Sequence, residues 1–228
     1  VILEVESLYY NISNIENTSQ LTFFKNDMRI SIITTNFNTA KYLEETIQSV
    51  LNQKGDFDLE YIITDGGSTD GSLEIIRKYK NRLKYISEKD TGQSNGINKG
   101  LKMSTGDIVA FLNSDDIYLE GTLEKVANYF KQHHDCMWLT GYCRIINKHG
   151  KEYKKIVTKY KNNKLKNFNF SQLLIENCIS QPATFIRKAV LTEVGYLDEH
   201  LHYSMDQDYW ARIALKYNLH VIYDYLAA

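Results

Sequence analysis

Short runs of β-branched and apolar residues alternate along the chain with segments whose apolar positions recur at helical spacing. The first run covers residues 29–35, and Leu43, Ile47, Val50 and Leu51 follow it at the spacing of one helix face. Alternation of this kind predicts an α/β fold, with a mostly parallel central sheet flanked by helices on both faces. The later strands are expected at 59–64, 83–87 and 107–112, and the later helices around 73–76, at 95–103 and at 119–133.

The pattern changes after Leu112, where the helix at 119–133 is followed by different elements. Two strands are expected at 138–146 and 151–157, joined by a turn at Gly150, and a last helix over 206–217. Between these elements, residues 159–166 are basic and lack apolar periodicity, which is typical of a solvated loop. Basic segments also bind anionic lipid surfaces, and that alternative stays open.

The first 27 residues differ from the rest of the chain. They mix apolar and polar positions, contain many Asn and Ser, and have no Gly. We therefore expect residues 1–27 to be an N-terminal appendage or linker of unknown role, followed by a main domain over 28–228.

Composition narrows the class of protein. The 228 residues include 27 Lys+Arg and 28 Asp+Glu, and 43% are hydrophobic. This predicts a soluble globular protein and excludes a disordered chain or a generally basic nucleic-acid binder. No apolar run approaches the ~18–20 residues that span a bilayer. The three cysteines lack metal-ligand spacing and are expected as reduced thiols in a cytosolic protein.

Acidic residues gather where the expected strands end. Asp65 closes the second strand, and Asn113, Ser114, Asp115 and Asp116 close the fourth. A single Asp at such a place is often only a turn or cap residue. Two adjacent carboxylates behind a buried strand repel each other unless a cation neutralises them. Oxygen ligands suit Mg²⁺ or Mn²⁺ bridging to a diphosphate, so this edge is a candidate metal-assisted nucleotide site.

Six segments in a fixed order resemble one known family. They are ISIITTNFNTAKYLEETIQSVLNQ, EYIITDGGSTDGS, SEKDTGQSNGINKG, TGDIVAFLNSDD, QPATFIRKAVLTEVGYLDE and SMDQDYWARIA. Together they resemble the family 2 glycosyltransferases of bacterial polysaccharide synthesis, over roughly residues 28–224. The resemblance implies the GT-A fold, which has a Rossmann-like sheet and a smaller antiparallel element on the acceptor side. It also implies a nucleotide-sugar-binding half at 28–116 and an acceptor-binding half at 117–228.

The resemblance assigns the donor and metal residues position by position. Asp65 would contact the nucleotide base, with Thr35 as a neighbour or only a helix-entry residue, and Asp90 would contact the sugar or nucleotide. In the family's Asp-x-Asp metal motif, Asn113 replaces the first Asp and would face the ribose, while Asp115 would bind Mn²⁺ or Mg²⁺. Asp116 would either reach the metal through water or only orient the loop.

The resemblance also places the catalytic base. Asp206 begins the matching Asp-x-Asp stretch and would deprotonate the acceptor hydroxyl, although an N-cap role is the structural alternative. Met205 stands where the family more often has Glu, which puts the acceptor contacts in question. Asp208 and Arg212 are expected to pair with each other.

Two further polar residues keep two readings each. Lys99 would meet the diphosphate or be solvated, and His202 would complete the metal shell or lie on the surface. Gln181, before Pro182, would touch the acceptor.

The implied reaction is an inverting transfer of sugar from a nucleotide sugar, most often a UDP-sugar, to a saccharide or lipid-linked acceptor. No nucleic-acid partner is expected. The implied location is cytoplasmic, with a peripheral contact at the inner face of the plasma membrane as an open alternative. The replacement at Asn113 also leaves open a degenerate nucleotide-sugar-binding or scaffold domain of a larger polysaccharide synthase. Oligomeric state is not indicated.

Overall fold

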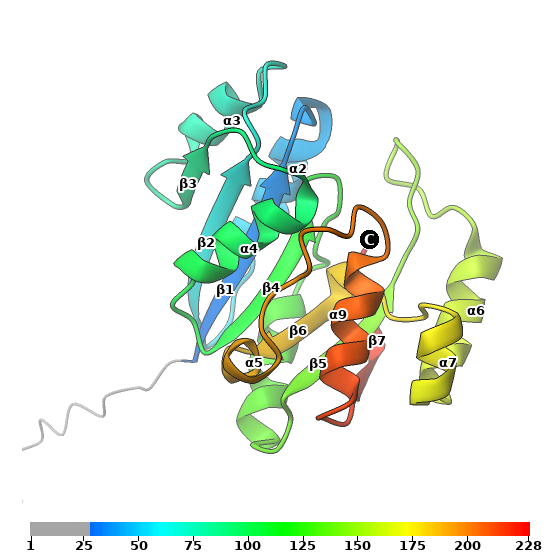
Figure 1. Cartoon of the computed structure of the whole chain (residues 1–228). Helices are drawn as coiled ribbons and strands as arrows, with labels where there is room; N and C mark the ends of the chain where they lie inside the picture. The colour runs from blue at the N-terminus through cyan, green and yellow to red at the C-terminus, as the bar shows by residue number, and fades with distance from the viewer. Residues whose placement is uncertain (1–27) are drawn as a thin grey trace, which may run out of the picture.

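A computed structural model describes residues 28–228 of the chain (Figure 1). Within this range seven strands form one sheet in the order β3-β2-β1-β4-β6-β5-β7. β1 pairs in parallel with β2 and β4, β2 pairs in parallel with β3, and β5 in parallel with β7. β6 runs antiparallel to both of its neighbours. The expected mostly parallel α/β sheet is therefore confirmed, and the antiparallel pairing lies on the side of the later elements.

The strands begin and end close to the positions that the pattern predicts in the first half. Their bounds are β1 (Arg29–Asn36), β2 (Asp58–Asp65), β3 (Lys84–Ser87), β4 (Ile108–Asn113), β5 (Trp138–Cys143), β6 (Thr184–Arg187) and β7 (His220–Ala227). The helices are α2 (Ala40–Leu51), α3 (Ser72–Lys78), α4 (Gln93–Met103), α5 (Thr122–Gln132), α6 (Lys155–Lys166), α7 (Phe170–Ile175), α8 (Ala189–Val194) and α9 (Met205–Ala214), with the 3₁₀ turn η1 (Gln181–Ala183). None of the helices within residues 28–228 is long and apolar enough to cross a membrane.

The core has two layers because successive strand residues point to opposite faces of the sheet. In β1, Ile32 packs into the cluster under α2, α3 and α5, whereas Ile33 packs into the cluster under α4, α8 and α9. Both side chains are fully buried. Burial on two faces explains why β4 (IVAFLN) reads as a nearly continuous apolar run, and why β1 (RISIITTN) consists mostly of β-branched and small residues without charged ones in its interior.

Strand register brings the polar strand ends into one row. Asn36 pairs with Asp65 across β1 and β2, and Asp65 pairs with Ser87 across β2 and β3. On the other side of β1, Thr35 pairs with Asn113 of β4. Ligands of open parallel sheets bind at this carboxyl edge, so the register alone assembles a candidate site there.

Two expectations in the second half are wrong. Residues 151–157 do not form a strand, because α6 begins at Lys155 and continues through the basic stretch 159–166 that was expected as a loop. Only an isolated bridge between Ile146 and Glu152 remains of the expected hairpin, around a turn at Gly150.

The physical reason for the error is the small buried face of α6. Thr158 and Leu165 are its buried residues and stand seven positions apart, two helical turns. Two buried positions among lysines are too few to show as helical periodicity. The neighbouring apolar pair Ile156 and Val157 favours a strand locally.

Candidate active site

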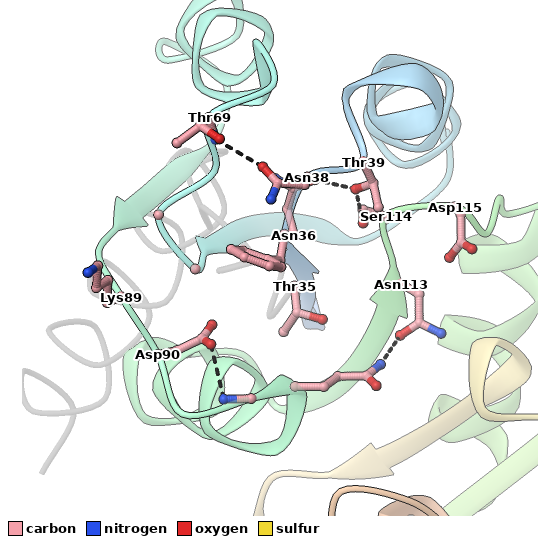
Figure 2. Close-up of a pocket in the computed structure, with 15 residues that line it drawn as sticks. Thr35, Asn36, Asn38, Thr39, Thr69, Lys89, Asp90, Asn113, Ser114 and Asp115 are labelled. Atoms are coloured by element: carbon pink, nitrogen blue, oxygen red, sulfur yellow. Dashed lines mark hydrogen bonds between the residues drawn. The ribbon is translucent and has the colours of Figure 1, made fainter.

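A cavity of about 860 Å³ lies at the carboxyl edge of the sheet, over the ends of β1 and β4 (Figure 2). Four separate segments supply its walls: the exit of β1, the loop after β2, the loop before α4 and the loop after β4. The lining residues are Thr35, Asn36, Phe37, Asn38, Thr39, Gly66, Gly67, Thr69, Lys89, Asp90, Gly92, Gln93, Asn113, Ser114 and Asp115. We call this space the donor cavity, after the role that the family resemblance implies for its residues.

Hydrogen bonds between these segments fix the rim of the donor cavity (Figure 2). The backbone N–H of Thr69 donates to Asn38 Oδ1 at 2.9 Å, joining the β2 loop to the β1 exit. Thr39 and Ser114 share a hydroxyl hydrogen bond of 2.6 Å, which joins the β1 exit to the β4 loop. Thr39 therefore does not cap α2 with its side chain. The walls of the cavity are therefore loops that are hydrogen-bonded to one another at the carboxyl edge of the sheet.

Asp90 lies in the wall of the donor cavity, as expected of a donor contact. Its Oδ1 accepts a hydrogen bond of 3.1 Å from the backbone of Gly92. A Cβ on Gly66 would lie 2.7 Å from Asp90 Oδ2 and 3.2 Å from the Phe37 ring. The β2 loop therefore passes directly against these two side chains, and a side chain at position 66 would push Asp90 out of its present position.

Asp65 lies beneath the donor cavity rather than in its lining. Its side chain is buried, with a residue exposure of only 2%. Its carboxylate accepts hydrogen bonds from Ser68 Oγ at 2.5 Å, Asn36 Nδ2 at 2.7 Å and Ser87 Oγ at 2.7 Å. Burial alone would raise the pKa of Asp65, but the hydrogen bonds from Ser68, Ser87 and Asn36 outweigh it and lower the pKa. These contacts make Asp65 the residue that ties three strand ends together.

Asn113 lies in the cavity floor, where the resemblance puts a ribose contact. Its Oδ1 accepts a hydrogen bond of 2.6 Å from Gln93 Nε2, and its Nδ2 donates to Asp116 Oδ2 at 3.0 Å. Gln93 was not singled out from the sequence, although it stands inside the quoted segment SEKDTGQSNGINKG. Gln93 is the polar first residue of α4 and directly follows Gly92. That position is the signal in the sequence that could have identified it.

Asp115 and Asp116 occupy different environments despite their adjacency. Asp115 is exposed and lines the donor cavity. Burial raises the pKa of the Asp116 carboxyl, and the charge of Asp115 raises it further, to about 7. A cation beside the pair would relieve this repulsion, so the donor set fits a divalent metal. No group of three or more His, Cys, Asp or Glu side chains converges within residues 28–228, so further ligands would have to come from substrate and water.

A second, smaller cavity of about 340 Å³ adjoins the donor cavity, since Asp115 lines both. Its wall also contains Asp116, Gln181 and Asp206. Because it lies on the side of the later elements, we call it the acceptor-side cavity. Gln181 Nε2 donates to the backbone carbonyl of Phe111, which anchors η1 to β4.

Asp206 lies in the first turn of α9. The N-cap position belongs to Ser204, so Asp206 is not the cap. Its Oδ2 accepts a hydrogen bond of 2.8 Å from Asn177 Nδ2, which orients the carboxylate at the wall of the acceptor-side cavity. The expected pair of Arg212 with Asp208 is confirmed, with Nε donating to Oδ2 at 2.9 Å.

Lys99 and His202 lie outside the lining of the donor cavity. Lys99 Nζ forms an ion pair of 2.7 Å with Glu88 Oε1. His202 Nδ1 would lie 3.8 Å from a Cβ built on Gly92, which places the ring beside the loop that precedes α4.

Comparisons with known proteins identify the family. The family model described as "Glycosyl transferase family 2" matches residues 31–194. An uncharacterized glycosyltransferase of Methanocaldococcus jannaschii is 30% identical over 206 residues, which are 86% of this chain and 69% of that protein. The poly(ribitol-phosphate) β-N-acetylglucosaminyltransferase TarP of Staphylococcus aureus is 39% identical over 131 residues, 55% of this chain and 38% of TarP.

Solved structures show the same fold. The crystal structure of S. aureus TarS residues 1–349 in complex with UDP has a TM-score of 0.64 and 25% identity, over 88% of this chain and 60% of that one. The mannosyltransferase PcManGT of Pyrobaculum calidifontis, in complex with GDP-Man and Mn²⁺, has a TM-score of 0.64 at 17% identity, over 88% of this chain and 56% of that one. The chain thus spans only part of these longer proteins. Since the family model covers most of the chain and the archaeal relative is matched over most of its length, the chain belongs to glycosyl transferase family 2 and has the GT-A fold.

Proposed function

We propose that the protein is an inverting glycosyltransferase that moves sugar from a UDP-sugar to the hydroxyl of a saccharide or lipid-linked acceptor. The observation that carries this proposal is the position of Asp115 on the wall shared by the donor cavity and the acceptor-side cavity. The second of these cavities also contains Asp206. A metal-binding carboxylate and a base on adjoining cavities are the parts that a direct displacement requires.

The donor cavity has groups suited to a nucleotide. Thr35 and Asp90 offer hydrogen-bonding groups, and the largely exposed Phe37 ring offers a face for stacking. We assign the base and sugar contacts to these residues, with Asn113 facing the ribose, and Asp65 holding the strand ends that carry them. The choice of UDP follows the relatives, because the similar TarS structure contains UDP.

The metal would be held by Asp115, with Asp116 behind it. A divalent cation bound there would neutralise charge on the departing diphosphate. Asp116 accepts a hydrogen bond from Asn113, so the same loop would position the ribose and the metal relative to each other. The pair of carboxylates supplies few ligands, which suits a cation that keeps water and substrate oxygens in its shell.

Asp206 acts as general base in this proposal. It takes the proton from the acceptor hydroxyl while that oxygen attacks the anomeric carbon, and the bond from that carbon to the diphosphate oxygen breaks. Attack from the side opposite to the leaving group inverts the anomeric centre in a single displacement. The two halves, 28–116 and 117–228, then hold donor and acceptor respectively.

Calorimetric titration with UDP, GDP and dTDP, each with Mn²⁺ and with EDTA, tests the proposal. We expect UDP to bind with Mn²⁺ and to lose most of its affinity in EDTA and in Asp115→Asn. Asp135→Asn, at an exposed carboxylate between α5 and β5, is the matched control and should bind as the wild type does.

Each other outcome would change the proposal. Binding that EDTA leaves unchanged would remove the metal from Asp115 but keep the nucleotide site. Absence of binding to all three nucleotides would favour a scaffold domain without catalysis.

A further inference from the structure

The helices α6 and α7 lie side by side at one flank of the molecule, away from α2 and α3 (Figure 1). Tyr160 Oη of α6 donates to Glu176 Oε2, just after α7, at 2.9 Å. Both helices leave large apolar side chains in solvent: Ile156 is 86% exposed and Ile175 is 85% exposed. Exposed isoleucines on two neighbouring helices are uncommon on a surface that has no partner.

Helical geometry shows that the exposed apolar residues of α6 are not part of its packing. Thr158 and Leu165 face the body of the protein and are buried. At 100° per residue, Ile156 and Tyr160 share the opposite side of the helix, and Val157 lies on its flank. The fold therefore uses one face of α6 and leaves an apolar stripe on the other.

The charge of this segment is opposite to that of the rest of the chain. Residues 151–176 contain seven lysines and two glutamates, whereas the whole chain has a net charge of −1. The two glutamates already face lysines, since Glu152 pairs with Lys155 at 3.7 Å and Glu176 with Lys164 at 3.8 Å. The segment thus combines exposed apolar side chains with a surplus of positive charge.

We infer that α6 and α7 dock on an anionic lipid bilayer surface. We name the docking surface the α6–α7 face, formed by Tyr153, Ile156, Tyr160, Leu174 and Ile175 with the lysines around them. Apolar side chains that enter the headgroup region, flanked by lysines that reach anionic headgroups, are the features of a helix that lies on a membrane. An apolar protein partner would account for the isoleucines but not for the excess of lysine.

This orientation has a consequence for the acceptor. The inner side of α6 contributes Thr158 and Lys161 to the acceptor-side cavity, so one short helix separates that cavity from the α6–α7 face. Docking would hold the cavity beside the headgroups, where a lipid-linked acceptor presents its sugar. This consequence rests on the proposed function, whereas the docking itself does not.

Vesicle co-sedimentation of the full chain tests the docking without nucleotide or acceptor. We expect binding to vesicles that contain phosphatidylglycerol, little binding to pure phosphatidylcholine, and release at about 0.5 M salt, where the Debye length is only a few ångströms. The double variant Ile156→Asp/Ile175→Asp should bind anionic vesicles about tenfold or more weakly, because two apolar contacts are lost and negative charge is added. Leu215→Asp, at a residue that is 70% exposed just after α9, is the control and should bind normally.

Two outcomes would overturn the inference. One is equal sedimentation of the wild type and the double variant with anionic vesicles. The other is a wild-type dimer in analytical ultracentrifugation that Ile156→Asp/Ile175→Asp converts to monomer, which would assign the face to a second copy. Titration of the double variant with UDP and Mn²⁺ reports separately on the donor cavity, so failure of docking and failure of the proposed function are distinguishable.

Discussion

At the scale of single residues, the carboxylates at the sheet edge differ by what surrounds each of them. Asp65 is buried among hydroxyl and amide donors, which lower its pKa. Asp116 is half-buried beside another carboxylate, and partial burial together with the charge of Asp115 raises its pKa to about 7. Asp206 accepts one hydrogen bond from Asn177 at the wall of a cavity. These surroundings agree with a positioning role for Asp65, and the proposed function assigns the metal side of the site to Asp115 and Asp116 and proton transfer to Asp206.

Replacing Asp206 with Asn should abolish transfer while leaving nucleotide binding intact. The amide cannot take a proton from the acceptor hydroxyl, and loss of a general base costs about 10²–10⁴-fold in rate. The measurement is sugar transfer alongside UDP titration in the same preparation. Asp208→Asn, two residues further along α9, is the control and should retain transfer. Full activity of Asp206→Asn would remove Asp206 as the base.

Replacing Asp65 with Asn distinguishes a positioning role from a direct contact with the base. An amide NH₂ placed among Ser68, Ser87 and Asn36 leaves donors facing donors, so we expect the free energy of unfolding to fall by about 1–3 kcal/mol. UDP affinity should fall with it. Urea unfolding and calorimetry measure the two effects, and Ser87→Ala should show a smaller loss. Weaker UDP binding at unchanged stability would instead support the base contact that the family resemblance implies.

At the scale of elements, Glu60 links neighbouring strands at the amino edge of the sheet, opposite to the cavities. From β2, it accepts hydrogen bonds from Ser31 of β1 at 2.6 Å, Lys84 of β3 at 2.8 Å, and the backbone of Thr105 before β4 at 2.6 Å. Burial alone would raise the pKa of Glu60, but these contacts outweigh it and lower the pKa to about 2. One side chain thus joins three strands and a loop.

Removing this charge should weaken the fold in a pH-dependent way. The depressed pKa corresponds to about 3 kcal/mol of stability at neutral pH. This contribution is present above the unfolded pKa, near 4.5, and is lost as the pH falls towards the folded value of about 2. Glu60→Gln should therefore lose about 2–3 kcal/mol at pH 7, roughly half of that near pH 3, and little near pH 2. Urea unfolding at these pH values measures this, with the exposed Glu120→Gln as a control. A difference that is the same at all of these pH values would contradict the assignment.

At the scale of the whole molecule, the donor cavity collects side chains from the first half and Asp115 connects it to the cavity of the second half. A ligand that binds across this junction stabilises only the folded chain.

We therefore expect UDP with Mn²⁺ to raise the melting temperature. At a hundred times the dissociation constant the gain is about 2.7 kcal/mol, or roughly 5–10 °C for a chain of this size. EDTA and Asp115→Asn should both remove most of the shift, whereas Asp206→Asn should keep it. Differential scanning fluorimetry measures the melting temperature of the wild type with Mn²⁺, of the wild type with EDTA, and of both variants. A full shift in EDTA would argue against a metal at Asp115.

The sequence alone determined the first half of the fold and the residue types of the site. The central strands are buried on both faces, so their apolar runs are visible without any tertiary information. Polar residues at strand ends are equally visible, which singled out Asp65 and Asn113. Their placement in one row with Asn36 comes from the register between strands far apart along the chain.

Only the tertiary structure decided the second half and the surroundings of each carboxylate. α6 buries only two residues, so its sequence shows no helical periodicity of apolar positions, and the helix forms because of its packing. Asp65 looks like a ligand-facing strand end in sequence, yet donors from three separate segments enclose it. Such enclosure depends on contacts between residues far apart along the chain, which no local pattern encodes. For the same reason the exposed stripe on α6 became visible only once the buried side of that helix was known.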